Sequence, residues 1–492
     1  MGASWSVGER GVHLWVVDHV GRPTPAVADR PAYADGVASP TNRPGVVWFR
    51  RDLRIDDNPA WSAATSECSK VVALFVLDPR LLNAAGPFRR RQLLANVAAL
   101  DEELRERTGA GLTIREGNPA EVVPAVVAEV ASDALFFNVD VSPFSTRRDG
   151  LVVAGLPSDV EPRRFYGTLV HPPGVVLTKN GALSKVFTPF WRAWTATPLV
   201  PWPAPGPAEI VALASTVSVS LDADPPMVPG AAGALARLEE FVTHADRYGD
   251  ERDRPGIRGT SMLSADLKYG TLSPRTALDV VGESTPGRAA WCRQLAWRDW
   301  YAHLLAEYPM LEREPMSERY RDVDWADDPE ALEAWKQGLT GYPLVDAGMR
   351  ELAATGWMHN RVRMVTASFL VKDLLIDWRL GEAHFRHLLI DGDTPQNVGN
   401  WQWSAGTGPD AAPYHRIMNP VLQSRKFDTD GDYIRKWVPE LAGLQARDVH
   451  APWELAPLDL ATAGVTLGDT YPWPIVDHFE ARQKFMTAFR LE

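Results

Sequence analysis

The stretch that decides the fold runs from Gly356 to Trp403 and reads GWMHNRVRMVTASFLVKDLLIDWRLGEAHFRHLLIDGDTPQNVGNWQW. Its first part carries arginines on a helical pattern, and its second part adds two carboxylates, Asp391 and Asp393, and an Asn-rich turn. An ordinary core helix buries apolar side chains and does not need charged and amide groups interleaved with tryptophans. We therefore predict that this stretch surrounds a buried polar ligand with a large flat ring.

The length and composition of the chain indicate a globular protein with more than one domain. The 492 residues exceed one ordinary domain, and 45% of them are hydrophobic and 23% charged. The sequence has no apolar run of about 18 residues, which excludes a membrane span. Cys68 and Cys292 show neither a disulfide framework nor a metal-ligand spacing, so we expect no metal and a reducing compartment, the cytoplasm.

The charge and the tryptophan content limit the possible partners. A net charge of −12 gives no electrostatic case for nucleic acid over the whole protein, so a DNA partner would need a local basic groove. The chain holds 19 tryptophans, and 12 of them lie between Trp291 and Trp473. Extra core and interface aromatics are the ordinary explanation for such an excess.

The first half of the chain predicts an α/β domain. Residues 1–43 lack periodicity and are expected to be a disordered extension. Residues 44–175 alternate strand patterns with helical patterns, which is typical of a doubly wound parallel sheet that binds ligands at the carboxyl ends of its strands. The strands are expected at 45–49, 71–77, 112–115 and 134–139, and the helices at 87–107 and 120–130. No GxGxxG occurs, so an ordinary dinucleotide fingerprint is absent.

The second half predicts an all-α domain behind a linker. Eight prolines between Pro198 and Pro229 indicate an extended crossing, and we assign residues 176–230 to the interdomain linker. Residues 231–492 form the helical domain. Its helices are expected at 235–248, 276–281, 289–308, 329–337, 343–355 and 362–378.

Three local patterns in this domain could bind a ligand. The run 259–264, GTSMLS, offers hydroxyl and N–H groups for an anion, although simple helix capping explains it as well. Gln294 and Trp297 lie about one turn apart and could hold a planar base, or could be core positions. Asn360 and Met364 share one helix face.

A charged pair adds to the third pattern. Arg363 follows Asn360 on the same helix, and Asp391 could be its counter-ion, because a buried guanidinium needs one. A flavin ring would fit between such groups, since its N3–H and carbonyls need an acceptor and donors. A salt bridge that joins two helices is the alternative.

At this point the sequence resembles a known family, the photolyases and cryptochromes, and most closely the bacterial class I cyclobutane pyrimidine dimer photolyases. The resemblance runs from about Val46 to Leu441. The segments that carry it are WFRRDLR (48–54), RGTSMLS (258–264), LSPR (272–275), GYPLVDAGMREL (341–352), TGWMHNRVRMVTASFLVKDLLIDW (355–378), DGD (391–393) and NWQWSAGTGPDAAPYHRIMNP (400–420).

The resemblance implies an N-terminal antenna domain and a helical domain that holds FAD in a U-shaped conformation, reduced in its active form. The residues expected at the FAD phosphates are Tyr248, Thr260, Ser261, Met262, Leu263 and Ser264. Those expected around the ring and ribose are Trp291, Arg298, Arg363, Asp391, Gly392 and Asp393. Asn397 falls beside the flavin N5, and Trp401, Trp378 and Trp325 fall on the family's electron-hopping chain.

The resemblance also implies a substrate, UV-damaged DNA with a flipped-out pyrimidine dimer. The residues expected to contact the dimer or the adjoining backbone are Arg252, Gln294, Trp297, Asn360, Arg361, Met364, Trp403 and Gln423. Class I enzymes have Glu at the position of Gln294. Gln is familiar there from animal-type cryptochromes and (6-4) photolyases, but those have a His pair where this chain has His359-Asn360. Dimer repair therefore remains the first hypothesis, with an altered photoproduct preference as the alternative.

Two further expectations rest on the resemblance. Lys268 lies where relatives that use 8-hydroxy-5-deazaflavin carry a Lys facing the antenna pocket, so we expect that chromophore rather than methenyltetrahydrofolate, another flavin or an empty pocket. A surface Lys paired with Asp266 is the alternative for Lys268. We expect a monomer without an obligate protein partner. A cryptochrome-type light sensor is the competing function, and the short C-terminal region 442–492 disfavours it weakly.

Overall fold

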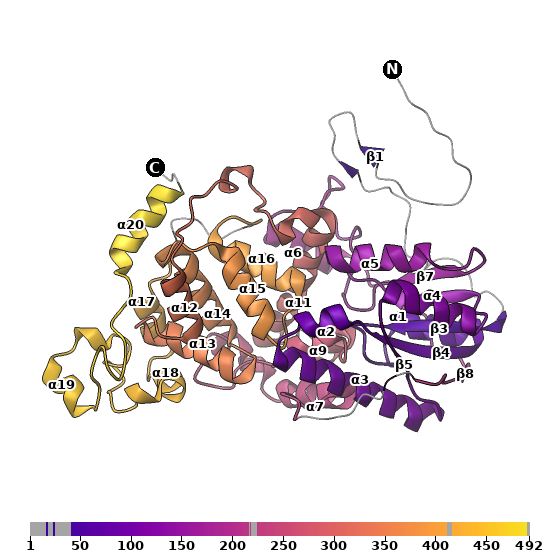
Figure 1. The fold of residues 1–492 in the computed structure, drawn as a ribbon, viewed down its shortest axis with the longest axis horizontal. Coiled ribbons are helices and arrows are strands. Elements are labelled where there is room, and N and C mark those ends of the chain that lie inside the picture. The colour runs from indigo at the N-terminus through magenta and orange to yellow at the C-terminus, as the bar shows by residue number, and fades with distance from the viewer. Residues whose placement is uncertain are drawn as a thin grey trace, which may run out of the picture.

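The computed structural model describes residues 41–215, 217, 224–410 and 416–489, and before them two short antiparallel strands, β1 (Val16–Val17) and β2 (Pro23–Thr24). The expected disorder of residues 1–43 therefore falls largely outside the described residues. A sheet domain and a larger helical domain lie side by side (Figure 1). None of the described helices is long and apolar enough to cross a membrane.

The first domain contains the predicted parallel sheet. The central strand pairs in parallel with a neighbour on each side, and the strand order is β5-β4-β3-β6-β7. The strands are β3 (Thr41–Phe49), β4 (Cys68–Leu77), β5 (Thr113–Glu116), β6 (Ala134–Asn138) and β7 (Glu161–Phe165). The order reverses at β3, which is where doubly wound sheets bind ligands, at the carboxyl ends of the strands.

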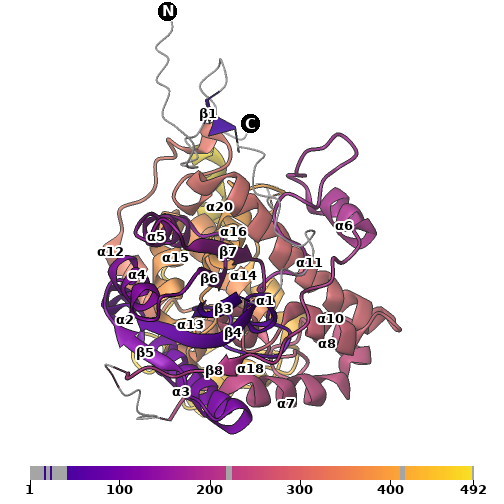
Figure 2. The same ribbon diagram turned by 90° about the vertical axis from the view of Figure 1, so that its right-hand side faces the viewer.

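Four of the five described helices of this domain begin where a polar residue precedes a proline. In α1 (Pro59–Glu67) the Asn58 side chain accepts a hydrogen bond from the Trp61 N–H, and Ser142 does the same for Ser145 in α5 (Pro143–Ala154). A polar N-cap satisfies an otherwise unpaired N–H, and proline tolerates the first helical position. The other helices of this domain are α2 (Pro79–Ala84), α3 (Pro87–Thr108) and α4 (Pro119–Glu129), and the helices cover both faces of the sheet (Figure 2).

The helical domain follows in the order predicted from the sequence, with long helices packed around several apolar clusters. Its helices are α7 (Gly230–Val242), α8 (Tyr248–Glu251), α9 (Ser264–Tyr269), α10 (Pro274–Val281), α11 (Pro286–Glu307), α12 (Pro329–Gln337), α13 (Pro343–Thr355), α14 (Asn360–Ser368), α15 (Trp378–Leu388), α16 (Thr394–Ala405), α17 (Pro420–Phe427), α18 (Asp432–Trp437), α19 (Pro457–Thr462) and α20 (His478–Ala488).

Two of the expected helices differ from those observed. The prediction of one helix over 362–378 was wrong: α14 continues into a π-helical turn, Phe369–Asp373, and the chain then turns at Leu375, whose φ is 54°. A new helix, α15, begins where Asp377 accepts a hydrogen bond from the Arg379 N–H. The helix expected at 235–248 is α7, which ends at Val242 and is followed by a short 3₁₀ turn.

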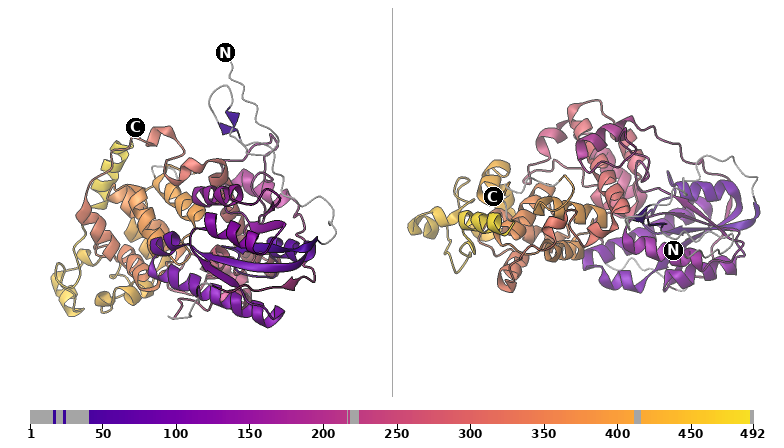
Figure 3. Two further views of the ribbon diagram at one scale, coloured as in Figure 1. Left: turned by 45° about the vertical axis from the view of Figure 1, so that its right-hand side comes forward. Right: turned by 90° about the horizontal axis from the view of Figure 1, so that it is seen from above.

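The segment expected as a linker contains ordered elements. A short strand, β8 (Glu209–Ile210), pairs in parallel with β4, and α6 (Phe187–Ala196) buries Phe187, Phe190 and Trp194 in an apolar cluster with α11. The apolar face of α6 explains why it packs: its aromatic residues recur at helical spacing. The crossing thus reaches from α6, packed on α11, to β8 at the end of the sheet that lies away from the helical domain (Figures 1 and 3).

The two domains are docked through the loop after β3. The Leu53 N–H donates to the Tyr269 carbonyl (3.1 Å), and the Arg54 guanidinium donates to the Gly270 carbonyl (2.9 Å). Gly270 has a φ of 68°, and a Cβ on it would lie 2.1 Å from the Arg51 carbonyl oxygen. Only glycine fits such an approach. The WFRRDLR segment therefore holds the α/β domain against the helical one.

Candidate functional site

The opening stretch folds into α14, the π-helical turn, α15 and α16, and its polar side chains meet. The Arg363 guanidinium forms two hydrogen bonds to the Asp391 carboxylate, at 3.1 and 2.9 Å, and its Nε donates to the Met358 carbonyl at 2.7 Å. The Asp391 side chain is 4% exposed. The structure thus contains the predicted buried ion pair between Arg363 and Asp391.

A cavity lies between α14 and α16, beside that ion pair. Its volume is about 80 Å³. The residues of the flavin and substrate sets that line it are Asn360, Arg363, Met364, Asp391, Gly392, Asp393, Asn397 and Trp401. The Asn397 amide donates to the carbonyl and carboxylate oxygens of Glu382, which fixes its orientation. Side chains that span 42 positions of sequence therefore surround one space.

The predicted phosphate-binding run lies on a second cavity. Thr260 and Met262 line a space of about 840 Å³ together with Trp357 and His359, next to Asn360 of the smaller cavity. Met262 has a φ of 56°, and the Trp291 indole N–H donates to the Ser261 hydroxyl at 3.0 Å, so α11 holds this loop.

The remaining members of the phosphate set have different surroundings. Leu263 is buried in an apolar cluster, so only its backbone could contact a ligand. Ser264 begins α9. The Tyr248 ring is half-buried and packs edge-on against Phe241.

The Arg298 guanidinium has partners within the protein. It donates to the carbonyls of Thr168, just after β7, and of Leu267 in α9. Burial lowers its pKa from the ordinary value, and Asp393 counteracts that effect. Arg298 therefore joins three segments, and its expected contact with the flavin stays a prediction.

Two residues of the substrate set, Asn360 and Met364, line the small cavity. Asn360 contacts the Met364 sulfur at 3.9 Å, as their shared helix face predicted. Gln294 is half-buried and donates to the Ala290 carbonyl. Arg361 forms an ion pair with Asp253 at 2.8 Å. The contact of these residues with DNA stays a prediction.

The aromatic members of this set form rigid surfaces. Trp297 stacks on Phe187 with ring centroids 3.6 Å apart and planes 11° apart. Trp403 is partly buried against the helical core, and Arg252 lies 5.6 Å from the Tyr248 ring. Gln423 lies on α17. Phe187 was missed in the sequence because it falls in the segment expected as a linker.

The three tryptophans of the expected hopping chain differ in burial. Trp401 is 2% exposed and Trp378 is 1% exposed, while Trp325 is only partly buried and packs against Phe489 with centroids 5.7 Å apart. Trp401 also lines the small cavity. Their expected order as a hopping chain, from the cavity to the surface, stays a prediction.

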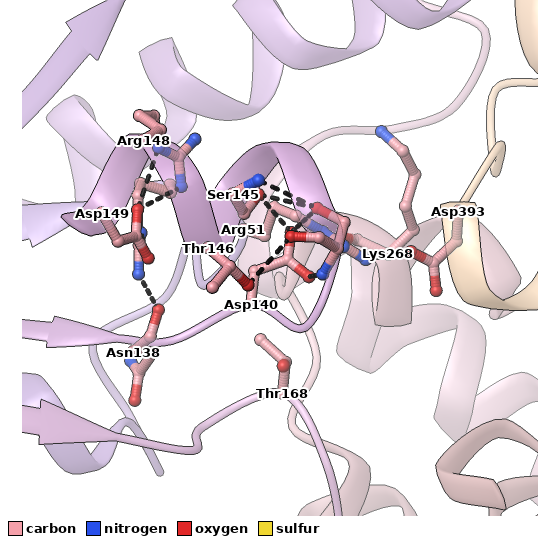
Figure 4. A network of polar contacts seen from close by, with 12 residues as sticks. Arg51, Asn138, Asp140, Ser145, Thr146, Arg148, Asp149, Thr168, Lys268 and Asp393 are labelled. Carbon is pink, nitrogen blue, oxygen red and sulfur yellow. Dashed lines mark hydrogen bonds and ion pairs between the residues drawn. The ribbon is translucent and has the colours of Figure 1, made fainter. Parts of the chain in front are cut away.

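A third cavity, of about 620 Å³, lies between the two domains. It is bordered by the carboxyl ends of β3 and β4, by α5 and by the α9 and α16 ends. Lys268 and Arg51 line it, and so do Gly392 and Asp393, which also line the cavity between α14 and α16. Figure 4 shows Lys268 and Asp393 opposite the side chains of the sheet domain.

The contacts of Lys268 distinguish between its two possible roles, a residue that faces the antenna pocket and a surface residue paired with Asp266. Asp266 pairs with Arg237, at 2.6 and 2.9 Å, so it is not the partner of Lys268. The Lys268 ammonium instead lies 3.6 Å from the centre of the Tyr269 ring. Burial and the neighbouring Arg89 and Arg51 lower its pKa well below the ordinary value, so the amine loses its proton more readily than an exposed lysine, and an anion in the cavity would favour its charged form.

Comparison with known proteins gives the same assignment. Residues 45–208 match the family described as DNA photolyase, and residues 291–491 match the FAD binding domain of DNA photolyase. A deoxyribodipyrimidine photo-lyase from Escherichia coli is 41% identical over 90% of this chain and 98% of its own length. This name is that of the enzyme class predicted from the sequence.

Solved structures agree with the fold. A bacterial class III photolyase from Agrobacterium tumefaciens superposes with a TM-score of 0.85 at 36% identity, covering 92% of this chain and 98% of that one. A cryptochrome from Synechocystis has a TM-score of 0.81 at 29% identity, covering 91% of this chain and 99% of that one. The chain belongs to the photolyase/cryptochrome family. The family supports light-driven DNA repair and FAD as the cofactor.

Proposed function

We propose that this protein repairs DNA in light by splitting cyclobutane pyrimidine dimers. The observation that carries the proposal is the shared cavity of Asn360, Met364, Arg363 and Asp391. Residues expected at the damaged bases and residues expected at the flavin line the same space, which electron transfer between the two requires. The family and its photo-lyase relatives support the same activity.

The side chains around this cavity fit the polar edge of a flavin. The ring edge offers one N–H and two carbonyls, and Asp393, Asn397 and Arg363 provide acceptors and donors for them. The Glu382 contacts hold the Asn397 amide in one orientation. Bound reduced FAD would supply, on excitation, the electron that opens the cyclobutane ring.

The substrate side fits an extruded dimer. A dimer stacks and pairs poorly, so an enzyme extrudes it at a lower cost than a normal base, and photolyases are among the enzymes that do so. The stacked pair of Trp297 and Phe187 gives a flat apolar wall, and Arg361 can exchange Asp253 for a phosphate. Phosphate contacts set the register, while the wall and Asn360 contact the lesion.

The repair assay tests this proposal. The purified, reduced protein is illuminated with blue light in the presence of an oligonucleotide that carries one thymine dimer, and the intact dimer is counted by chromatography. We expect dimers to disappear only in the light. Persistence of the dimers while oxidised FAD photoreduces normally would favour the light sensor instead.

The same assay distinguishes between the two candidate photoproducts when it is applied to a Gln294 variant and to both substrates. A glutamine keeps a donor and an acceptor but cannot supply a proton or a charge. We expect Gln294→Glu to accelerate dimer repair if the site is that of a dimer enzyme. Repair of a (6-4) photoproduct by the unmodified protein, with no repair of the dimer, would identify the alternative substrate.

The electron-hopping role of the three tryptophans can be tested separately from repair. We expect Trp401→Phe to abolish photoreduction of oxidised FAD, because the first indole next to the cavity is lost, and to leave repair by pre-reduced protein largely intact. Transient absorption and the repair assay measure the two effects. Equal loss of photoreduction and of repair would contradict the electron-hopping role of Trp401.

The interdomain cavity is the proposed antenna site, and we infer that it holds 8-hydroxy-5-deazaflavin. Among the described residues, cationic side chains outnumber carboxylates in its lining, which favours an anionic chromophore. Reconstitution with the deazaflavin, with methenyltetrahydrofolate and with FMN, followed by the excitation spectrum of repair, tests the assignment. A new excitation band with only one of them identifies the chromophore.

A further inference from the structure

Two carboxylates separated by one residue have counter-ions in different domains. Asp391 pairs with Arg363, which lies in the same domain. Asp393 pairs with Arg51, whose position is 342 residues earlier, in the loop after β3 (Figure 4). The second pair therefore crosses the domain junction next to the proposed flavin site.

The Arg51 guanidinium is held by more than this one partner. It forms a second ion pair with Asp140 at 3.0 Å, and its Nε donates to the Lys268 carbonyl at 3.2 Å. The Ser145 hydroxyl donates to the same Asp140 oxygen at 2.9 Å. Burial alone would lower the pKa of Arg51, but the two carboxylates raise it above the ordinary value, so the guanidinium stays charged.

Asp393 forms part of the wall between two cavities. It lines both the interdomain cavity and the cavity between α14 and α16. It also precedes the first residue of α16, and its carbonyl accepts from the Asn397 N–H at 2.8 Å. The position of Asp393 therefore determines the positions of the first turn of α16 and of Asn397.

We propose that Arg51 is a positioning residue for the flavin site, acting from the other domain through Asp393. This inference rests on the proposed FAD site. The guanidinium fixes the carboxylate and neutralises it, so that the ring meets an oriented acceptor. Without Arg51, Asp393 and Asp140 would face each other across the junction as like charges, and the start of α16 would lose its tether.

The test compares Arg51→Gln with Arg163→Gln. Arg163 is a suitable control because it forms a similar half-buried pair, with Glu67, wholly inside the sheet domain. FAD dissociation constants and the midpoint potential of bound FAD are measured in the full chain, without DNA. We expect Arg51→Gln to weaken FAD binding roughly tenfold, in the range of ordinary coupling between sites. The potential should also become more negative, because an unneutralised carboxylate disfavours the electron-rich ring.

A double-mutant cycle with Asp393→Asn separates positioning from general damage. If Arg51 acts through Asp393, Arg51→Gln should have little further effect in the Asp393→Asn background. Arg51→Lys keeps the charge and should restore most of the potential, and it carries the test if Arg51→Gln does not fold. An Arg51→Gln protein that matches Arg163→Gln, or an effect that is unchanged in the Asp393→Asn background, would overturn the inference. Failure of the unmodified protein to bind FAD would instead overturn the proposed function.

Discussion

The sheet domain and the helical domain place their buried charged side chains differently. The two faces of the sheet carry clusters of valine, leucine, phenylalanine and alanine, and its buried charged groups lie in the segments that follow the strands: Asp52, Arg54, Asp78, Arg148 and Asp149. The helical interior instead contains Asp299, His303, Asp373, Glu382 and Asp391 well inside its packing. Burial of such groups costs stability unless each is paired. The stability of the helical domain therefore depends on such pairs, and the pair of Arg363 with Asp391 lies beside the proposed flavin cavity.

The largest effect is expected from breaking the buried ion pair of the helical domain. Arg363→Ala leaves Asp391 buried without its partner, which should lower the free energy of unfolding by about 3–5 kcal/mol. The purified protein should also lose FAD, which its absorbance near 450 nm reports. Arg163→Ala breaks the pair with Glu67, in which both side chains are about one-fifth exposed, and should cost less than about 1 kcal/mol. Equal losses from both variants would contradict the comparison.

The pH dependence of stability should also come from the helical domain. Residues 44–165 contain no histidine, whereas His303 is buried in α11 and donates to the His171 carbonyl at 2.9 Å. Burial lowers the pKa of His303 to about 4. The fold therefore holds the neutral form, and this contribution is complete above the unfolded pKa of about 6.5 and is lost as the pH falls toward 4.

The variant His303→Gln isolates that contribution. The amide can still donate to the His171 carbonyl but does not titrate in this range. Between pH 7 and pH 4.5 the unmodified protein should lose roughly 2–3 kcal/mol more stability than the variant, measured by urea unfolding at each pH. Parallel losses in the two proteins would place the acid sensitivity elsewhere.

A smaller effect is expected from added volume inside the helical domain. A Cβ at Gly381 of α15 would lie 2.2 Å from the Trp401 ring and 2.5 Å from Leu370. Gly381→Ala should therefore cost about 1–3 kcal/mol and displace Trp401. Urea unfolding reports the cost, and slower photoreduction of FAD would report the displacement. An increase in stability would show that the packing around Trp401 is loose.

The smallest effect is expected from the corresponding glycine-to-alanine substitution in the sheet domain. Gly150 lies inside α5, and a Cβ there would meet nothing within 4 Å. Gly150→Ala should raise stability by about 0.4–1 kcal/mol, because the unfolded chain loses freedom and the folded chain loses no space. A thermal melt measures it. A destabilised Gly150→Ala protein would mean that α5 tolerates as little as α15.

Much of the fold could be predicted because it depends on local patterns. The alternation of buried strands with helices is a property of neighbouring residues, and it placed β3, β4, β5 and β6 to within a few positions. The break at Leu375 was missed because the apolar pattern continues across it. The helix α6 was missed because the surrounding prolines concealed its aromatic face.

Some contacts of the candidate site could likewise be predicted from local patterns, and others could not. The ion pair of Arg363 with Asp391 was predictable, since the two residues lie 28 positions apart in one motif-rich stretch and a buried guanidinium needs a counter-ion. The contact of Arg51 with Asp393 was not, because no local pattern pairs two residues that lie 342 positions apart in sequence. The stacking of Phe187 on Trp297 was hidden for the same reason.

The sequence by itself determined the family, the two domain types and most of the residues expected around a flavin. These follow from residue identities and short spacings, which the chain carries before it folds. Only the tertiary structure decided which side chains share a cavity, that Gly392 and Asp393 separate two cavities, and that an arginine of the sheet domain neutralises Asp393. Contacts between domains depend on how two finished surfaces dock, and no local pattern encodes that.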